Sequence, residues 1–155
     1  MSLPAGYSIR RATKSDYDGI TSVLKVLTKV GNVKKEDFDS VVEHWDSVKI
    51  DGSHHMYNCT VITNEIGEVV ATGSLIMERK VIHECGLVGH IEDIAVREDQ
   101  QGKKLGLFLI QYLYKLAKES GCYKAILDCA EKNVGFYEKC GLQKAGVEMQ
   151  IRFGR

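Results

Sequence analysis

The chain has 155 residues, 44% hydrophobic and 27% charged, a composition typical of one soluble globular domain spanning residues 1–155. Lysine plus arginine and aspartate plus glutamate both number 21, so the net charge is zero, which argues against a nucleic-acid or anionic-membrane partner. The sequence contains no run of 18 apolar residues and no visible signal peptide, so we expect a cytoplasmic protein without a membrane span.

The first third of the chain combines one short strand with two helices. Alternating residues predict a strand at 7–11. Ser15-Asp16 offers an N-cap for a helix whose apolar residues, spaced by three and four, run from Ile20 to Leu27, before Gly31. A second amphipathic helix is expected over 35–48.

The middle of the chain reads as strands. Segments 58–63 and 68–78 flank a Gly-containing turn and predict a hairpin. Residues 79–85 are expected to form a connection or a short irregular strand, and 86–96 a strand rich in β-branched residues.

The last third alternates helices with strands. Apolar residues repeat at helical spacing over 105–117, and Gly121 ends that helix. A strand is expected at 123–128, a short helix at 131–139 and a final strand at 146–152. Because a strand, a long helix and a strand form a crossover, 86–96 and 123–128 should lie parallel. We therefore predict an α/β (α+β) domain with a central mixed sheet flanked by helices.

One turn carries a signal for phosphate binding. Gln101-Gly102-Lys103-Lys104-Leu105-Gly106 opens the long helix. The first N–H groups of a helix lack partners and attract anions, and glycines let a ligand approach the backbone closely. The turn is neither a P-loop nor a dinucleotide-binding fingerprint, and alone such a turn is more often structural.

The pattern resembles the acetyl-coenzyme A loop of the GNAT acetyltransferase superfamily, Gln/Arg-x-x-Gly-x-Gly/Ala. Gln101 and Gly106 match its ends, while Lys104 stands where a glycine is usual, a departure that a helical φ would make tolerable. Asn133-x-x-Phe136-Tyr137-x-x-x-Gly141 resembles the second coenzyme motif of the superfamily.

A closer resemblance runs nearly end to end. The segments at 24–28, 78–83, 89–96, 126–129, 133–141 and 146–152 are similar to the eukaryotic glucosamine 6-phosphate N-acetyltransferase family. The resemblance implies a GNAT fold, transfer of acetyl from acetyl-CoA to the 2-amino group of glucosamine 6-phosphate by direct attack in a ternary complex, and a place in the pathway to UDP-N-acetylglucosamine. It also implies a homodimer whose active sites draw on both chains.

The resemblance assigns roles to individual residues. Those expected to bind the coenzyme lie on one strand, the turn and the short helix: Ile94, Ala95, Val96, Gln101, Gly102, Lys103, Lys104, Leu105, Gly106, Asn133, Phe136 and Tyr137. Those expected to bind the amino sugar or its phosphate are mostly charged: Thr28, Lys80, His83, Glu92, Asp93, Lys124, Asp128 and Arg152.

Four side chains are candidates for the chemistry. Adjacent residues of a strand point to opposite faces, so Glu92 and Asp93 form no obvious acid–base pair unless a bulge intervenes, and Glu92 is the candidate for positioning the amine. Tyr137 can protonate the departing thiolate, or it is simply a core aromatic beside Phe136. Asp128, at the carboxyl end of its strand, can orient the amine or cap the following helix.

Several alternatives remain open. The chain could be a GNAT enzyme for another small or peptide amine, a non-catalytic acetyl-CoA-binding sensor, or a general nucleotide-binding domain. Five cysteines without a Cys-x-x-Cys motif suggest reduced thiols, and a zinc site at His83, Cys85 and His90 is disfavoured, so no metal is expected. An acetyl-cysteine route through Cys129 or Cys140 is disfavoured because no His lies at a recognisable spacing.

Overall fold

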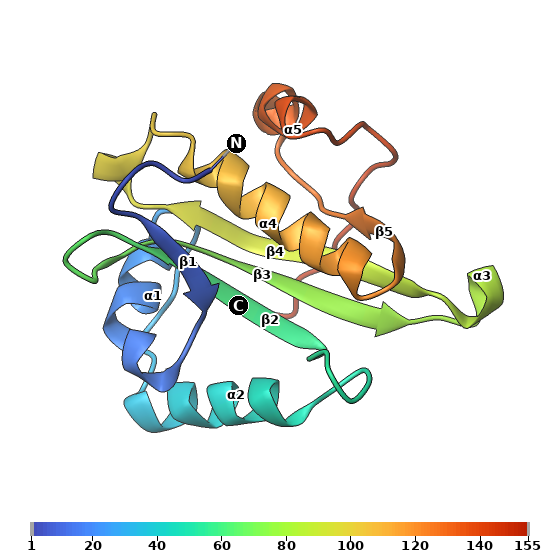
Figure 1. The fold of residues 1–155 in the computed structure, drawn as a ribbon, viewed down its shortest axis with the longest axis horizontal. Helices are drawn as coiled ribbons and strands as arrows, with labels where there is room; N and C mark the ends of the chain where they lie inside the picture. The colour runs from blue at the N-terminus through green and yellow to red at the C-terminus, as the bar shows by residue number, and fades with distance from the viewer. Residues whose placement is uncertain (1, 155) are drawn as a thin grey trace.

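A computed structural model describes residues 2–154 of the chain. Five strands and five helices make up the fold (Figure 1). The strands are β1 (Ser8–Arg11), β2 (Tyr57–Thr63), β3 (Val69–Arg79), β4 (Leu87–Val96) and β5 (Cys122–Ile126). The helices are α1 (Tyr17–Leu24), α2 (Lys35–Ser47), α3 (Ile82–Cys85), α4 (Leu105–Glu119) and α5 (Val134–Lys139). Short 3-10 turns precede α1, α4 and α5.

The five strands form one mixed sheet in the order β1-β2-β3-β4-β5. Neighbours from β1 to β4 are antiparallel, and β4 and β5 are parallel on either side of the α4 connection. The predicted mixed sheet and the predicted crossover are both confirmed. None of the helices in the described part of the chain is long and apolar enough to cross a membrane.

Helices cover both faces of the sheet (Figure 1). The apolar stripe of α4, including Leu109 and Leu113, packs on one face with Ile62, whereas α1 and α2 pack on the other with Val61. Consecutive residues of β2 thus enter different cores, as strand alternation requires. Leu109, Leu113, Ile62 and Val61 are fully buried, and each such side chain contributes about 1.5–3 kcal/mol to folding.

The first helix is shorter than predicted. It ends at Leu24, and the chain continues in tight turns in which the Val26 and Leu27 amides donate to carbonyls three residues back, at 3.1 and 3.0 Å. Val26 and Leu27 are left 48% and 46% exposed. Leu27 continues the helical spacing of Ile20, Val23 and Leu24, but because its side chain is exposed, packing does not stabilise a further helical turn.

The predicted final strand is wrong. Residues 143–154 contain no regular structure, and the side chains that were expected to share one strand face are largely exposed, Val147 at 88%, Met149 at 90% and Ile151 at 77%. A strand requires a neighbouring edge for its hydrogen bonds, and no strand of the described chain pairs with this segment.

The connection predicted at 79–85 is confirmed as a connection rather than a strand. It contains α3, a single turn in which His83, Glu84 and Cys85 have positive φ values of 51°, 58° and 58°. The turn lies at the tip of the β3–β4 hairpin, away from the other helices (Figure 1).

Candidate active site

Strands β4 and β5 separate part-way along their length. Their pairing ends at His90 with Ile126, although β4 continues to Val96 with β3 as its other neighbour. The strand predicted to reach Asp128 therefore ends two residues earlier. Beyond His90, the edge of β4 that faced β5 leaves backbone N–H and C=O groups available for a ligand that enters as an added strand.

A β-bulge interrupts β4 beside this opening. The register with β3 shifts between Thr72 and Ser74, and Asp93 has a left-handed φ of 53°. Ile91 and Ile94, three residues apart, consequently both pack on the α4 side. Adjacent side chains of a regular strand point to opposite faces of the sheet, but a bulge breaks this alternation. The rule therefore does not fix where the side chains of Glu92 and Asp93 point.

The turn before α4 has the features of an anion site. No side chain caps the start of α4, so its first backbone N–H groups donate no hydrogen bond to an N-cap side chain. Gly102 has a φ of 86°, with no atoms within 4 Å of where a Cβ would stand. Lys104 also lies in the left-handed region, with φ 62° and ψ 20°, so the condition under which a non-glycine residue would fit this position easily, a helical φ, is not met. A glycine adopts this conformation without steric cost, which explains the usual residue of the motif.

The two predicted coenzyme segments meet. A Cβ on Gly106 would stand 3.1 Å from the Phe136 ring, so glycine allows the first turn of α4 and α5 to approach closely. Phe136 also packs edge-on against Tyr137, with ring centroids 5.0 Å apart. Asn133 immediately precedes α5, on the same short segment.

Tyr137 is half-buried beside polar groups. Burial raises the pKa of its phenol, and negative charge on Cys129, Cys140 and Asp128 would raise that pKa further. The hydroxyl therefore stays protonated at neutral pH and is available as a donor. Tyr137 also packs partly against the α4 core, which agrees with the alternative prediction of a core aromatic.

Carboxylates gather beyond the end of β5. Burial raises the pKa of Glu92, and the neighbouring charges of Asp128 and Asp93 raise it further. A hydrogen bond with Asp128 raises the pKa of Glu148. Sequence reasoning missed Glu148, although its position on the polar side of the 146–152 alternation was a usable signal.

The predicted phosphate-binding cations lie at the other end of the sheet. Lys80 Nζ is 3.2 Å from Glu78, which also accepts from His90 at 2.9 Å. His83 stacks on Tyr123 with ring centroids 4.0 Å apart, and the Lys124 ammonium is 5.9 Å from the same ring. Lys80, His83 and Lys124 lie around the hairpin tip and the start of β5, whereas Asp128 follows the end of β5.

Thr28 and Arg152 occupy separate segments. Thr28 is exposed in the turns that follow α1, and its amide donates to the Leu24 carbonyl at 3.1 Å. Arg152 lies in the extended tail, where its charge lowers the pKa of Glu148. Within one chain, the structure does not bring Thr28, Arg152 and the hairpin-tip cations into a single phosphate site.

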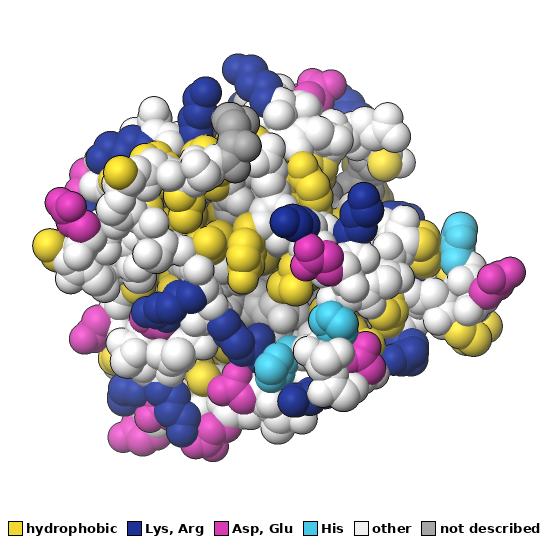
Figure 2. Space-filling view, viewed as in Figure 1, with side chains coloured by type: hydrophobic (Ala, Val, Ile, Leu, Met, Phe, Trp, Pro, Cys, Tyr) yellow, Lys and Arg dark blue, Asp and Glu magenta, His cyan; other side chains and the backbone are white. Residues whose placement is uncertain are grey.

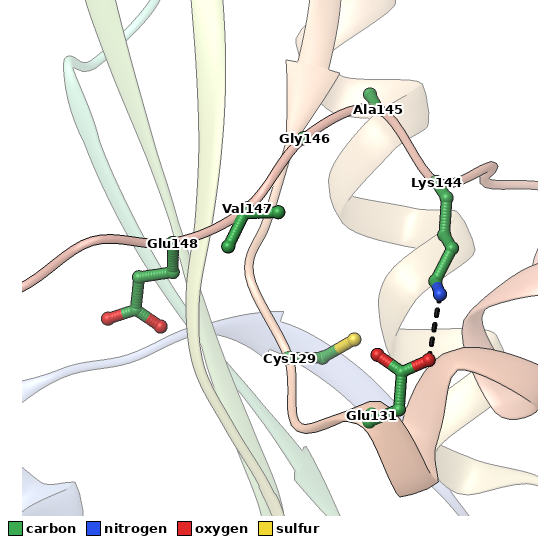
Figure 3. Close-up of a pocket in the computed structure, with 7 residues that line it drawn as sticks. All are labelled: Cys129, Glu131, Lys144, Ala145, Gly146, Val147 and Glu148. Carbon is green, nitrogen blue, oxygen red and sulfur yellow. Dashed lines mark hydrogen bonds and ion pairs between the residues drawn. The ribbon is translucent and has the colours of Figure 1, made fainter.

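A hollow of about 420 Å³ lies between the loop after β5 and the C-terminal tail (Figure 3). Cys129 and Glu148 line it, and an ion pair between Lys144 and Glu131, 2.7 Å apart, closes one side. None of the predicted site residues lines this hollow. Its position nevertheless borders the carboxylate group that includes Asp128.

Charge is scattered over the surface. On the α4 side, positive and negative side chains are interspersed rather than gathered into one patch (Figure 2). Among residues 2–154, no group of three His, Cys, Asp or Glu side chains could hold a metal ion. His83 and Cys85 in particular do not join His90 in a metal-binding group.

The mixed sheet with its parted strands and glycine-bearing turn can be compared with known proteins. The sequence profile described as the acetyltransferase (GNAT) family matches residues 23–142. The chain is 54% identical to the glucosamine 6-phosphate N-acetyltransferase of Candida albicans, over 99% of this chain and 100% of that protein. It is 39% identical to glucosamine 6-phosphate N-acetyltransferase 1 of Dictyostelium discoideum, over 94% and 90% of the two chains.

The same relationship appears in three dimensions. The crystal structure of glucosamine-6-phosphate N-acetyltransferase from Arabidopsis thaliana superposes with a TM-score of 0.88 at 38% identity, covering 95% of this chain and 98% of that one. The chain belongs to the GNAT acetyltransferase family and, within it, to the glucosamine 6-phosphate N-acetyltransferases.

Proposed function

We propose that this chain transfers the acetyl group of acetyl-CoA to the 2-amino group of D-glucosamine 6-phosphate, giving N-acetyl-D-glucosamine 6-phosphate and CoA. The observation that carries the proposal is the 54% identity, over the whole length, to a protein of that name. The reaction belongs in the route to UDP-N-acetylglucosamine. The five free cysteines favour a reducing compartment and hence the cytoplasm.

The coenzyme half of the reaction uses the opening of the β4–β5 pair. The pantetheine arm pairs with the free β4 edge at Ile94, Ala95 and Val96, and the diphosphate takes the N–H groups of the turn from Gln101 to Gly106. A β4 N–H holding the thioester oxygen would stabilise the developing oxyanion by about 2.7–4 kcal/mol. Phe136 and Asn133 complete the wall beside the turn.

The acceptor half uses the carboxylates. Glu92 and Asp128 accept hydrogen bonds from the amine and orient it, and Asp93 contacts the sugar. Because the pKa of Glu92 is raised, Glu92 takes up the amine proton more readily than an exposed carboxylate would. Tyr137, kept protonated by its raised pKa, donates to the thiolate as it leaves.

Attack is direct, in a ternary complex. Holding the amine and the thioester together supplies about 7–11 kcal/mol through proximity, so neither an acetyl-cysteine intermediate nor a metal ion is required. Burial raises the pKa of Cys140, which makes that thiol a poor nucleophile.

The active protein is a homodimer with shared sites. The tail carries Val147, Met149, Ile151 and Phe153 at alternate positions, each at least 77% exposed in the single chain. A second copy supplies both the edge and the apolar surface that such a segment needs. Arg152, on the opposite side of the alternation, then reaches the phosphate in the partner's site, with Thr28, Lys80, His83 and Lys124 as further contacts.

Thiol release from acetyl-CoA, measured with a panel of amines, tests this function. We expect rapid turnover with glucosamine 6-phosphate and little with glucosamine, a polyamine or a peptide amine. Equal rates with and without the phosphate would contradict the phosphate site. Binding of CoA without turnover of any amine would favour the sensor alternative.

A further inference from the structure

A hydrogen-bonded triangle ties the N-terminal segment to the turn before α4. The Tyr7 hydroxyl donates to Gln100 Oε1 at 2.5 Å. The Lys103 ammonium donates to the Tyr7 oxygen and to Gln100 Oε1, both at 3.1 Å. The same ammonium lies 5.8 Å from the centroid of the Tyr7 ring. Every pair in the triangle is joined, although Tyr7 is more than ninety residues away from its two partners.

The triangle holds the first half of the turn, at Gln100 and at Lys103. Gln100 ends the 3-10 turn that follows β4, and Lys103 stands between Gly102 and Lys104, the two residues with left-handed backbones. The two residues between them, Gln101 and Gly102, open the turn that the proposed function assigns to the diphosphate. Holding Gln100 and Lys103 therefore restricts this stretch before any ligand arrives.

Tyr7 is itself well anchored. Its ring packs against the larger hydrophobic core, and its amide donates to the Pro4 carbonyl at 3.2 Å. The chain then enters β1, which is paired with β2 in the sheet. The N-terminal segment runs beside the first turns of α4 (Figure 1). A tyrosine fixed in this way is a rigid support, in contrast to the exposed turn that it holds.

We propose that Tyr7 is a positioning residue for the coenzyme: through Gln100 and Lys103 it holds the 101–106 turn in the conformation that receives the diphosphate. The inference rests on the proposed coenzyme role of that turn. Tyr7 touches neither reactant. By ordering the 101–106 turn before the coenzyme binds, Tyr7 lowers the conformational entropy that is lost on binding. Coenzyme binding is therefore stronger, and the chemical step is unchanged.

The test is calorimetric titration of CoA into the full-length protein, beside steady-state kinetics. Tyr7→Phe keeps the ring and removes the hydroxyl, and we expect its Kd for CoA to rise about three- to tenfold, as loss of one hydrogen bond of this kind gives. The KM for acetyl-CoA rises with it, while kcat and the KM for the amine stay within twofold. Tyr112→Phe, which removes an exposed hydroxyl from α4, is the matched control and should leave all four quantities unchanged.

A double-mutant cycle separates positioning from a general loss of stability. Gln100→Met removes the other end of the Tyr7 hydrogen bond, so the Kd of Tyr7→Phe/Gln100→Met should exceed that of Gln100→Met by less than twofold. Additive effects, or a Tyr7→Phe Kd equal to that of the unmodified protein, would overturn the inference while leaving the proposed function standing. If Tyr7→Phe fails to fold, Gln100→Met alone must show the selective rise, and its absence overturns the inference. Failure of the unmodified protein to bind CoA would overturn the proposed function and this inference together.

Discussion

The residues predicted to bind the coenzyme and those predicted to bind the phosphate differ in how closely the fold brings them together. Beyond the point where the strands separate, one chain brings together the free β4 edge, the turn before α4, Phe136 and Tyr137. At the hairpin tip and the tail, the predicted phosphate ligands are spread over separate segments. In the proposed function, a single chain thus carries the residues assigned to the coenzyme close together and those assigned to the phosphate far apart, which favours a phosphate site completed by a second copy.

The sharpest test of the coenzyme half is Tyr137→Phe. Removing the proton donor should lower kcat by about a hundredfold or more, with little change in the affinity for CoA, because general acid catalysis is lost while the ring remains. Thiol-release kinetics and CoA titration measure the two quantities. Tyr114→Phe, on α4, is the control. An unaltered kcat would mean that Tyr137 serves only as a core aromatic.

The acceptor half is tested by Arg152→Ala. Loss of a charge-assisted contact to phosphate should raise the KM for glucosamine 6-phosphate about tenfold or more, while the KM for acetyl-CoA stays constant. Steady-state kinetics with each substrate varied in turn distinguish the two. Proportionate increases in both KM values would contradict the assignment of Arg152 to the phosphate.

A smaller effect is expected from Glu92→Gln on stability. The folded-state pKa of Glu92 is raised above its usual value of 4.5, so the folded protein holds this proton more tightly than the unfolded chain. Well below pH 4.5, Glu92 is protonated in both the folded and the unfolded chain, so it costs no stability. As the pH rises through the raised pKa, ionising Glu92 in the folded protein lowers the free energy of unfolding. Glu92→Gln should therefore melt slightly higher than the unmodified protein at neutral pH and equally under acid conditions. Glu65→Gln, in an exposed turn, should show no difference at either pH; a lower neutral melting temperature for Glu92→Gln would refute the argument.

The left-handed backbone at Lys104 predicts a stability difference between two substitutions at that single position. Lys104→Gly and Lys104→Ala both remove the charge, but only glycine relieves the steric cost of φ 62°. Lys104→Gly should be more stable than Lys104→Ala by about 1 kcal/mol in urea denaturation. Equal stabilities would show that the turn relaxes at this position.

The same contrast explains what could be read from the sequence. The α4 stripe is predictable because it depends on the spacing of nearby residues. The hairpin and the crossover are predictable because they depend on a turn signal and on the order of the elements along the chain. The bulge at Asp93 and the left-handed Lys104 are not, because they depend on the register with β3 and on the geometry of a turn. The coenzyme residues were accordingly easier to group than the phosphate ligands.

The tail shows the limit most clearly. The alternation of Val147, Met149 and Ile151 predicts a strand, but the segment forms none, because no strand of the described chain offers it an edge to pair with. Sequence periodicity indicates which side chains of a segment share a face, but it does not indicate which strand or surface packs against that face. The triangle of Tyr7, Gln100 and Lys103 could not be predicted from the sequence either, because Tyr7 is far from the other two residues along the chain and meets them only in the folded structure.

Complementation between two impaired variants tests the shared site most directly. Tyr137→Phe and Arg152→Ala chains are co-refolded and assayed at a glucosamine 6-phosphate concentration well below its KM. If Arg152 serves the partner's site, each mixed dimer carries one site free of both substitutions, and activity should return to about a quarter of the unmodified value when the chains mix at random. Activity that stays at the average of the two separate variants would contradict the account, since each chain would then supply its own Arg152.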